Sequence, residues 1–216
     1  MKSILSYPLD DDQAGLWFLG QSGYILRSTE VTIVIDPYLS DSVREIAPEF
    51  GRLYPPPLAP ADLKADIFIV THDHLDHLDP QTIGGYQHIE QTTFVAPRLA
   101  CRRLEALGIP AANIVRLDSG ESSNIRGTQI TGIYALPSEV EVIDTTGYKI
   151  ELANGRSVYH TSDTEFCELL LRCAPKAEVL LVCINGKDGN MGPQPAARLA
   201  RTVTPRVAAV PNHYDL

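Results

Sequence analysis

Three of the chain's six histidines lie in one short segment, Thr71-His72-Asp73-His74-Leu75-Asp76-His77. The segment follows an apolar run at residues 65–70, which predicts a strand. It precedes Asp79-Pro80, which is typical of a helix N-cap with proline at the first helical position. Imidazole and carboxylate groups are therefore expected to crowd one turn, where they suit a borderline divalent ion such as zinc, manganese or iron. A polar loop with surface histidines is the alternative that this spacing disfavours.

Further acidic and histidine side chains follow other predicted strands. Asp163 comes after the strand expected at 157–160, and His213 after the strand expected at 207–210. Open α/β sheets bind ligands just beyond the carboxyl ends of their strands, so these residues are candidate metal ligands. Taken singly, each would fit a helix-capping or surface role equally well. Asp36, after the strand expected at 31–35, is expected to orient a histidine rather than to bind metal.

The elements that must position these residues fall into two parts. Strands expected at 16–19, 24–27 and 31–35, with turns between them, predict an antiparallel meander. From residue 62 onward, strands alternate with helices. The further strands are expected at 93–96, 113–115, 129–136, 146–152, 157–160, 179–184 and 207–210, and the helices at 97–107, 165–173 and 195–203. The pattern predicts an α/β fold in which two mixed sheets pack face to face with helices outside.

The length of 216 residues favours a single domain that spans 1–216. The segment at about 38–62 has no clear periodicity and contains Pro55, Pro56, Pro57 and Pro60. It is too long for an ordinary connection, which predicts a functional loop or lid. A proline-rich motif that binds a partner protein is the alternative.

The charge and composition of the chain exclude some classes of binding partner. The net charge is -9 and no Lys/Arg-rich run is present, which disfavours nucleic acid as a partner. The N-terminal residues lack the features of an export signal, and no apolar run approaches the ~18 residues that a membrane-spanning helix needs. We therefore predict a cytoplasmic protein with a small-molecule substrate, and leave a homo-oligomer open. The cysteines form no C-x-x-C pair and are expected to be reduced core residues; they are Cys101, Cys167, Cys173 and Cys183.

Several motifs together resemble the metallo-β-lactamase superfamily, and within it the branch of L-ascorbate-6-phosphate lactonase and its relatives. They are Trp17 to Gly23, Asp36-Pro37, Thr71 to His77, Tyr159 to Asp163, Asn185-Gly186 and Pro211 to Tyr214, and they run nearly end to end. The resemblance implies a four-layer αββα sandwich. It also implies that His72 and His74 bind one metal ion, that Asp76, His77 and His213 bind a second, and that Asp163 bridges both.

The sequence departs from the family pattern in two places. Residues 133–139 lack the metal-binding histidine that relatives usually carry there, so the first ion is expected to be weakly held, or completed by water or a carboxylate such as Glu139. The sequence also ends at Leu216, soon after His213. Terminal residues fray unless they are tied down, so we expect order in the tail at 211–216 to depend on metal binding.

The predicted function is that of a metal-dependent hydrolase that opens a small lactone, sugar-derived and with or without a phosphate group. One or two manganese or zinc ions would supply the attacking hydroxide, and Asp76 would orient it and accept its proton. A phosphodiesterase on the same two-metal site, or a non-catalytic protein that binds metal and a metabolite, are the alternatives. Asn185, Lys187 and Asn190 lie in a Gly-rich loop and are candidate substrate contacts, although an ordinary polar turn explains them equally well.

Overall fold

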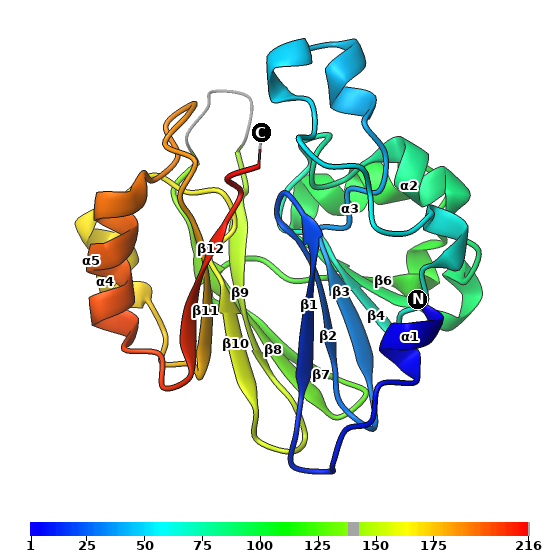
Figure 1. Ribbon diagram of the computed structural model, residues 1–216, viewed down its shortest axis with the longest axis horizontal. Helices are drawn as coiled ribbons and strands as arrows, with labels where there is room; N and C mark the ends of the chain where they lie inside the picture. Colours follow the sequence, from blue (N-terminus) through cyan, green and yellow to red (C-terminus); the bar gives the residue numbers. More distant parts are fainter. Residues whose placement is uncertain (138–142, 216) are drawn as a thin grey trace.

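The computed structural model describes residues 1–137 and 143–215 of the chain. Two six-stranded β-sheets pack face to face, and helices cover the outer face of each (Figure 1). This is the predicted α/β sandwich of two mixed sheets flanked by helices. None of the helices in the described ranges has the length and apolar character that crossing a membrane requires.

The first sheet uses the first half of the chain, in the spatial order of the sequence. Its strands are β1 (Gly15–Gly20), β2 (Gly23–Arg27), β3 (Thr32–Ile35), β4 (Ile67–Ile69), β5 (Thr93–Ala96) and β6 (Ile114–Arg116). β1 to β3 form the predicted antiparallel meander, and β3 to β6 are parallel. The carboxyl ends of β3, β4 and β5 therefore meet at one edge.

The second sheet uses the second half of the chain. Its order is β12 (Ala208–Asn212), β11 (Val179–Cys183), β10 (Ser157–His160), β9 (Thr146–Glu151), β8 (Thr128–Tyr134) and β7 (Ser122–Ile125). β10, β11 and β12 are parallel, whereas β7 to β10 are antiparallel. The carboxyl ends of three parallel strands thus also share an edge in this sheet.

Helices lie on the two outer faces of the sandwich (Figure 1). They are α1 (Lys2–Leu5), α2 (Pro80–Gly85) and α3 (Arg98–Ala106) on the side of the first sheet, and α4 (Glu168–Cys173) and α5 (Pro193–Val203) on the side of the second. Short 3-10 helices occur at Ser42–Glu45, Pro48–Phe50, Pro60–Asp62, Ile89–Gln91 and Ala111–Asn113. Asp79 is the N-cap of α2 and accepts hydrogen bonds from the Gln81 and Thr82 amides, which confirms the predicted helix start.

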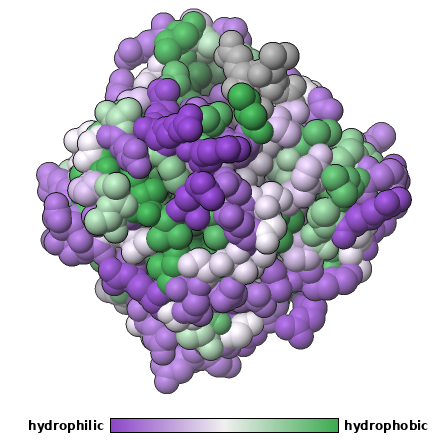
Figure 2. Space-filling view, turned by 180° about the vertical axis from the view of Figure 1, so that it is seen from behind, coloured by the Kyte–Doolittle hydropathy of each residue, from purple (hydrophilic) through white to green (hydrophobic). Residues whose placement is uncertain are grey.

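Alternation of side chains along the strands divides the apolar core into layers. In β3, Ile33 and Ile35 pack against the second sheet, whereas Val34 packs toward α2 and α3. In β11, Leu181 faces the first sheet, whereas Leu180 packs toward α4 and α5. Polar side chains cover much of the outside: on the rear face, hydrophilic residues dominate the outer parts and hydrophobic residues appear in separate patches (Figure 2).

Several elements differ from the sequence-based expectation, and three of the differences have a clear physical reason. β7 was not predicted because Ser122–Ile125 is mostly polar; it forms at the sheet edge, paired with β8 across a turn in which Arg126 and Gly127 both have positive φ. α4 begins at Glu168 rather than at 165, because Cys167 has an extended backbone (φ -147, ψ 165) and acts as the N-cap of the helix. β12 extends past 210 to Asn212 and includes Pro211, which an edge strand tolerates.

The segment predicted as a loop or lid contains three of the short 3-10 helices and is anchored by one buried arginine. Arg52 is only 5% exposed, and its guanidinium donates hydrogen bonds to the carbonyls of Leu19 (2.7 Å) and Tyr38 (2.6 Å). In Figure 1 this segment stands at the same end of the molecule as the C-terminus. This segment is thus tied to β1 through Arg52, and a lid function stays a prediction.

Candidate metal centre

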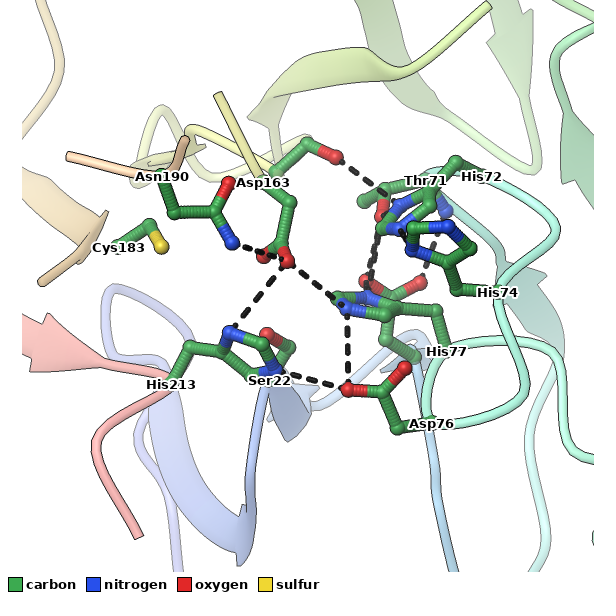
Figure 3. A network of polar contacts seen from close by, with 12 residues as sticks. Ser22, Thr71, His72, His74, Asp76, His77, Asp163, Cys183, Asn190 and His213 are labelled. Atoms are coloured by element: carbon green, nitrogen blue, oxygen red, sulfur yellow. Dashed lines mark hydrogen bonds and ion pairs between the residues drawn. The ribbon is translucent and has the colours of Figure 1, made fainter. Parts of the chain in front are cut away.

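The predicted ligands meet at one end of the sandwich (Figure 3). His72 to His77 lie on the loop after β4, Asp163 follows β10, and His213 follows β12. The first sheet therefore supplies one side of the site and the second sheet the other. The structure brings together all six residues proposed as ligands: His72, His74, Asp76, His77, Asp163 and His213.

Asp76, His77 and His213 form one group of potential ligands. Asp76 Oδ2 lies 2.9 Å from His213 Nε2 and 3.7 Å from His77 Nε2. Ligand atoms at about 2.0–2.2 Å from a tetrahedral ion are roughly 3.3–3.6 Å apart, so this spacing suits one shared divalent ion. The side chain of His77 is fully buried, whereas that of Asp76 is 17% exposed. Asp76 is therefore the member of this group that solvent reaches.

Asp163 stands between the two sides of the site. Its Oδ2 lies 3.6 Å from His77 Nε2 and 3.4 Å from His213 Nδ1. The same oxygen accepts a hydrogen bond of 2.7 Å from Asn190 Nδ2. Ligand atoms of Asp163 also lie within 4.8 Å of those of His72 and His77. Asp163 thus belongs to more than one potential ligand group, as a bridging residue must.

His72 and His74 face each other, with 3.0 Å between His72 Nε2 and His74 Nδ1. The tautomer of His72 follows from its other neighbour. Thr71 Oγ1 donates its only proton to Asp36 Oδ2 (2.6 Å), so it can only accept from His72 Nδ1, 3.0 Å away. His72 then carries its proton on Nδ1, and its Nε2 lone pair points toward His74.

Asp36 holds His77 in the same way. Asp36 Oδ2 lies 2.7 Å from His77 Nδ1, and because a carboxylate only accepts, the ring carries a proton on Nδ1. Asp36 Oδ1 accepts a second bond, of 2.8 Å, from the Thr71 amide. Both Asp36 and Thr71 are completely buried. Asp36 therefore turns Nε2 of His77 into the site, which is the placement that its predicted orienting role requires.

Two buried atoms indicate that the site fits a metal ion. His77 Nε2 and Asp163 Oδ1 have no hydrogen-bond partner among the described residues, although both are shielded from solvent. Buried polar atoms are nearly always paired, because leaving one unpaired costs about 1–3 kcal/mol. Imidazole nitrogen and carboxylate oxygen are the donors that zinc and manganese accept. The residues present thus fit a divalent ion.

The loops that carry the site adopt backbone conformations that side-chain-bearing residues rarely use. Asp36 (φ 40), Ser162 (φ 61) and His213 (φ 58) all lie in the left-handed region. Each such residue costs about 1–3 kcal/mol, which its surroundings must offset. The turns that follow these three strands are therefore held in place by the contacts around them.

The charged groups of the site shift one another's pKa values strongly. Burial lowers the pKa of His77, but the carboxylates of Asp76 and Asp163 outweigh burial and raise this pKa to about 10. Burial also lowers the pKa of His213, but the carboxylates of Asp163 and Asp76 outweigh it. The pKa of His213 therefore lies well above its usual range. By contrast, burial and the neighbouring His77 hold the pKa of His72 well below its usual range. Without an ion, protons on His77 and His213 therefore balance the carboxylates.

The candidate substrate residues have other neighbours in the structure. Asn185 Nδ2 lies 2.7 Å from His213 Nδ1, and Asn190 bonds to Asp163, so both amides contact proposed ligands. Lys187 is exposed, and its Nζ lies 5.4 Å from the centre of the Phe50 ring in the lid segment. A role for these three residues in substrate binding stays a prediction. Glu139, proposed to complete the first ion's shell, lies outside the described residues.

Sequence reasoning missed two residues of this site. Thr71 was part of the histidine segment, but its hydroxyl was not recognised as the link between Asp36 and His72. Cys183 was assigned to the core, yet its sulfur lies within 4.8 Å of ligand atoms of Asp163 and His213. The sequence did contain a signal for Cys183. It is the last residue of β11, and the proposed ligands also lie at or just beyond the carboxyl ends of strands.

The tail that carries His213 is held by protein contacts. The His213 amide donates to the Gln21 carbonyl (3.0 Å), and the Gln21 amide donates to Asp215 Oδ1 (2.9 Å). Gln21 Nε2 donates to the Asp215 carbonyl (2.8 Å). None of these contacts needs a metal. That order in the tail depends on metal binding stays a prediction.

Comparison with known proteins identifies relatives of the chain in both sequence and fold. The Beta-lactamase superfamily domain matches residues 31–214. A UPF0173 metal-dependent hydrolase of Methanosarcina mazei is 28% identical over 217 residues, which cover 92% of this chain and 82% of the relative. A solved structure of a possible metal-dependent hydrolase from Veillonella parvula is similar with a TM-score of 0.73 at 19% identity, covering 93% of this chain and 86% of that one. An isothiocyanate hydrolase from Delia radicum gut bacteria has a TM-score of 0.72 at 18% identity, covering 93% and 85%.

Proposed function

The chain belongs to the metallo-β-lactamase superfamily, and from this premise we propose that it is a metal-dependent hydrolase that opens a small lactone. The observation that carries the proposal is the overlap of potential ligand groups: among the described residues, His77 and Asp163 are shared between groups that also contain His72 or His213. Shared ligands are what two neighbouring ions need. Divalent ions in such a site lower the pKa of a bound water toward neutrality and stabilise the oxyanion that forms on attack.

The chain's own residues have distinct parts in this proposal. Asp36 and Thr71 fix the tautomers of His77 and His72, so that their Nε2 atoms are free to bind. Asp76 is partly open to solvent and is held as a carboxylate, because the charges of His77 and His213 outweigh burial and lower its pKa. It is the proposed catalytic residue, which orients the attacking water and takes its proton.

The lactone part of the proposal depends on side chains outside the set of proposed metal ligands. Near the site, Phe18 and Tyr214 stack with 6.0 Å between ring centres, and both are well exposed (40% and 52%). Exposed Lys187 lies on the loop that follows β11. An apolar wall and one cation suit a small ring with an ester carbonyl and an anionic substituent. Manganese or zinc are the proposed ions, and the cytoplasm is the proposed location.

A screen of the purified protein tests this function. The metal content is measured first, and then hydrolysis of lactones, thioesters, phosphodiesters and isothiocyanates is followed after loading with manganese or zinc. We expect lactone opening that chelation abolishes and metal restores. His213→Ala should be inactive, and His88→Ala, which alters a histidine outside the site, should keep wild-type activity.

Two alternative results would replace the proposal. Phosphodiesters hydrolysed faster than lactones would indicate a phosphodiesterase, which is the second candidate because a two-metal clamp serves phosphoryl transfer equally well. Tight metal binding without hydrolysis of any class would indicate a protein that binds metal and a metabolite. Failure to bind any divalent ion would contradict both the enzyme and the binding function.

A further inference from the structure

Cys183 lies where the ends of three parallel strands meet. It is the last residue of β11, and it pairs with Asn212, the residue before His213. On the other side of β11, strand β10 leads to Asp163. The side chain of Cys183 is fully buried. Its position obeys the same rule that places Asp163 and His213 at the site.

The sulfur of Cys183 is directed toward these two residues. One ligand atom each from Cys183, Asp163 and His213 lie within 4.8 Å of one another. In Figure 3 the sulfur is on the side of Cys183 that faces Asn190 and Asp163. The polar contact to Asn185 Oδ1 is long, at 3.9 Å. The imidazole of His213 is the other polar group that the thiol contacts.

A second observation points independently to a cation at this place. Asp163 is 7% exposed, and its Oδ1 has no hydrogen-bond partner among the described residues. Asn190 bonds to the other oxygen, Oδ2. A buried carboxylate oxygen normally has a donor or a cation beside it. Cys183 and His213 form one of the two groups of described residues that could share such a cation with it; His72 and His77 form the other.

We propose that Cys183 is a thiolate ligand of the ion that Asp163 and His213 hold, and that it makes this site selective for thiophilic ions. The proposal rests on the proposed metal-dependent function. Binding replaces the S–H bond of Cys183 by a sulfur–metal bond, and the proton passes to solvent. Thiolate binds zinc, cobalt and cadmium more strongly than manganese, which prefers oxygen.

Cobalt titration of the metal-free, full-length protein tests the proposal. Cobalt bound by nitrogen and oxygen gives visible d–d bands, and a thiolate ligand adds a charge-transfer band in the near ultraviolet. We expect both signals in the wild type, and Cys183→Ser should keep the visible bands but lose the near-ultraviolet band. Cys101→Ser, which alters another buried thiol, and Cys173→Ser, which alters an exposed one, should keep both.

X-ray absorption at the zinc edge of the wild-type protein gives the same answer without a variant. A sulfur neighbour at about 2.3 Å is expected. In competition, Cys183→Ser should lose roughly 10- to 100-fold of the preference for cadmium over manganese. Visible bands without a near-ultraviolet band, a near-ultraviolet band that survives in Cys183→Ser, or a zinc shell of nitrogen and oxygen alone would each overturn the proposal while leaving the metal-dependent function intact. No cobalt binding at all would overturn both.

Discussion

At the scale of single residues, the Thr71 hydroxyl has the widest influence on the site. It donates to Asp36 and accepts from His72, and so connects the buried carboxylate to a proposed ligand. Thr71→Val removes the hydroxyl at nearly constant volume. We expect metal affinity to fall by roughly 10- to 100-fold, as is typical when a residue that orients a ligand is lost. Isothermal titration measures the change. Thr71→Ser keeps a hydroxyl and is the matched control; equal affinity in both variants would show that the hydroxyl has no such role.

Asp76 gives a prediction about catalysis rather than folding. Asp76→Asn keeps the shape of the side chain but removes the charge beside His77 and His213. Activity should fall by about 100-fold or more, the usual contribution of a general base, while the circular dichroism spectrum is unchanged. Asp73→Asn, in the same loop, should be active. Full activity of Asp76→Asn would assign the proton transfer to another group.

The raised pKa values of His77 and His213 predict that metal binding releases protons. At pH 8 the metal-free site still holds these protons, because the pKa of His77 is raised to about 10 and that of His213 is also raised. Ligation requires the neutral rings, so these two histidines should release about two protons per site, and a thiolate ligand at Cys183 would add about one more. Titration calorimetry in buffers of different ionisation enthalpy counts them, and a heat independent of the buffer would contradict the charge assignment.

The same shifts fix the sign of the pH dependence for the metal-free protein. A histidine whose folded pKa is raised above 6.5 stabilises the fold fully below that value, and the contribution disappears as pH rises through the folded pKa. The metal-free protein should therefore lose stability between about pH 7 and 10, whereas the metal-bound protein should not.

At the scale of elements, the tail at residues 211–215 is hydrogen-bonded to the turn between β1 and β2. Asp215→Ala removes the carboxylate that accepts from the Gln21 amide, which should free the tail in the absence of metal. We expect hydrogen exchange to show a protected 211–215 segment in the metal-free wild type, and a segment in the variant that metal alone protects. The exposed carboxylate of Asp188, changed to alanine, is the control. A wild-type tail that exchanges freely until metal is added would show that the contacts to Gln21 do not hold it on their own.

The elements and ligands that could be predicted are those marked by a local pattern of apolar and polar residues in the sequence. Ile33 to Ile35 and Ile67 to Ile69 are short apolar runs, so β3 and β4 were expected, and residues beyond strand ends were found because parallel strands share an edge. Contacts between distant segments left no local signal. Gln21 and Asp215 are 194 residues apart, and nothing near either predicts that they meet. The polar strand β7 is likewise specified by pairing with β8 rather than by its own side chains.

At the scale of the whole molecule, the site joins the two sheets. Asp76 and His213, 137 residues apart, lie 2.9 Å from each other across the gap between the first and the second sheet. An ion bound there should stabilise the folded state by about 4 kcal/mol at a concentration 1,000 times its Kd. Thermal unfolding with and without a chelator measures the effect. His213→Ala should abolish the metal-induced shift, and His88→Ala should retain it; a shift of the same size in both would locate the stabilising ion elsewhere.

Each sheet is also a continuous half of the polypeptide: β1 to β6 end at Arg116, and β7 begins at Ser122. Neither half carries the full set of proposed ligands, since His72 to His77 belong to the first and Asp163 and His213 to the second. A polypeptide interrupted between these halves would yield two fragments that are each incompetent alone. If the chain is divided at residues 117–121, metal binding and activity should return only when the two fragments associate. The metal centre would then report association of the two halves.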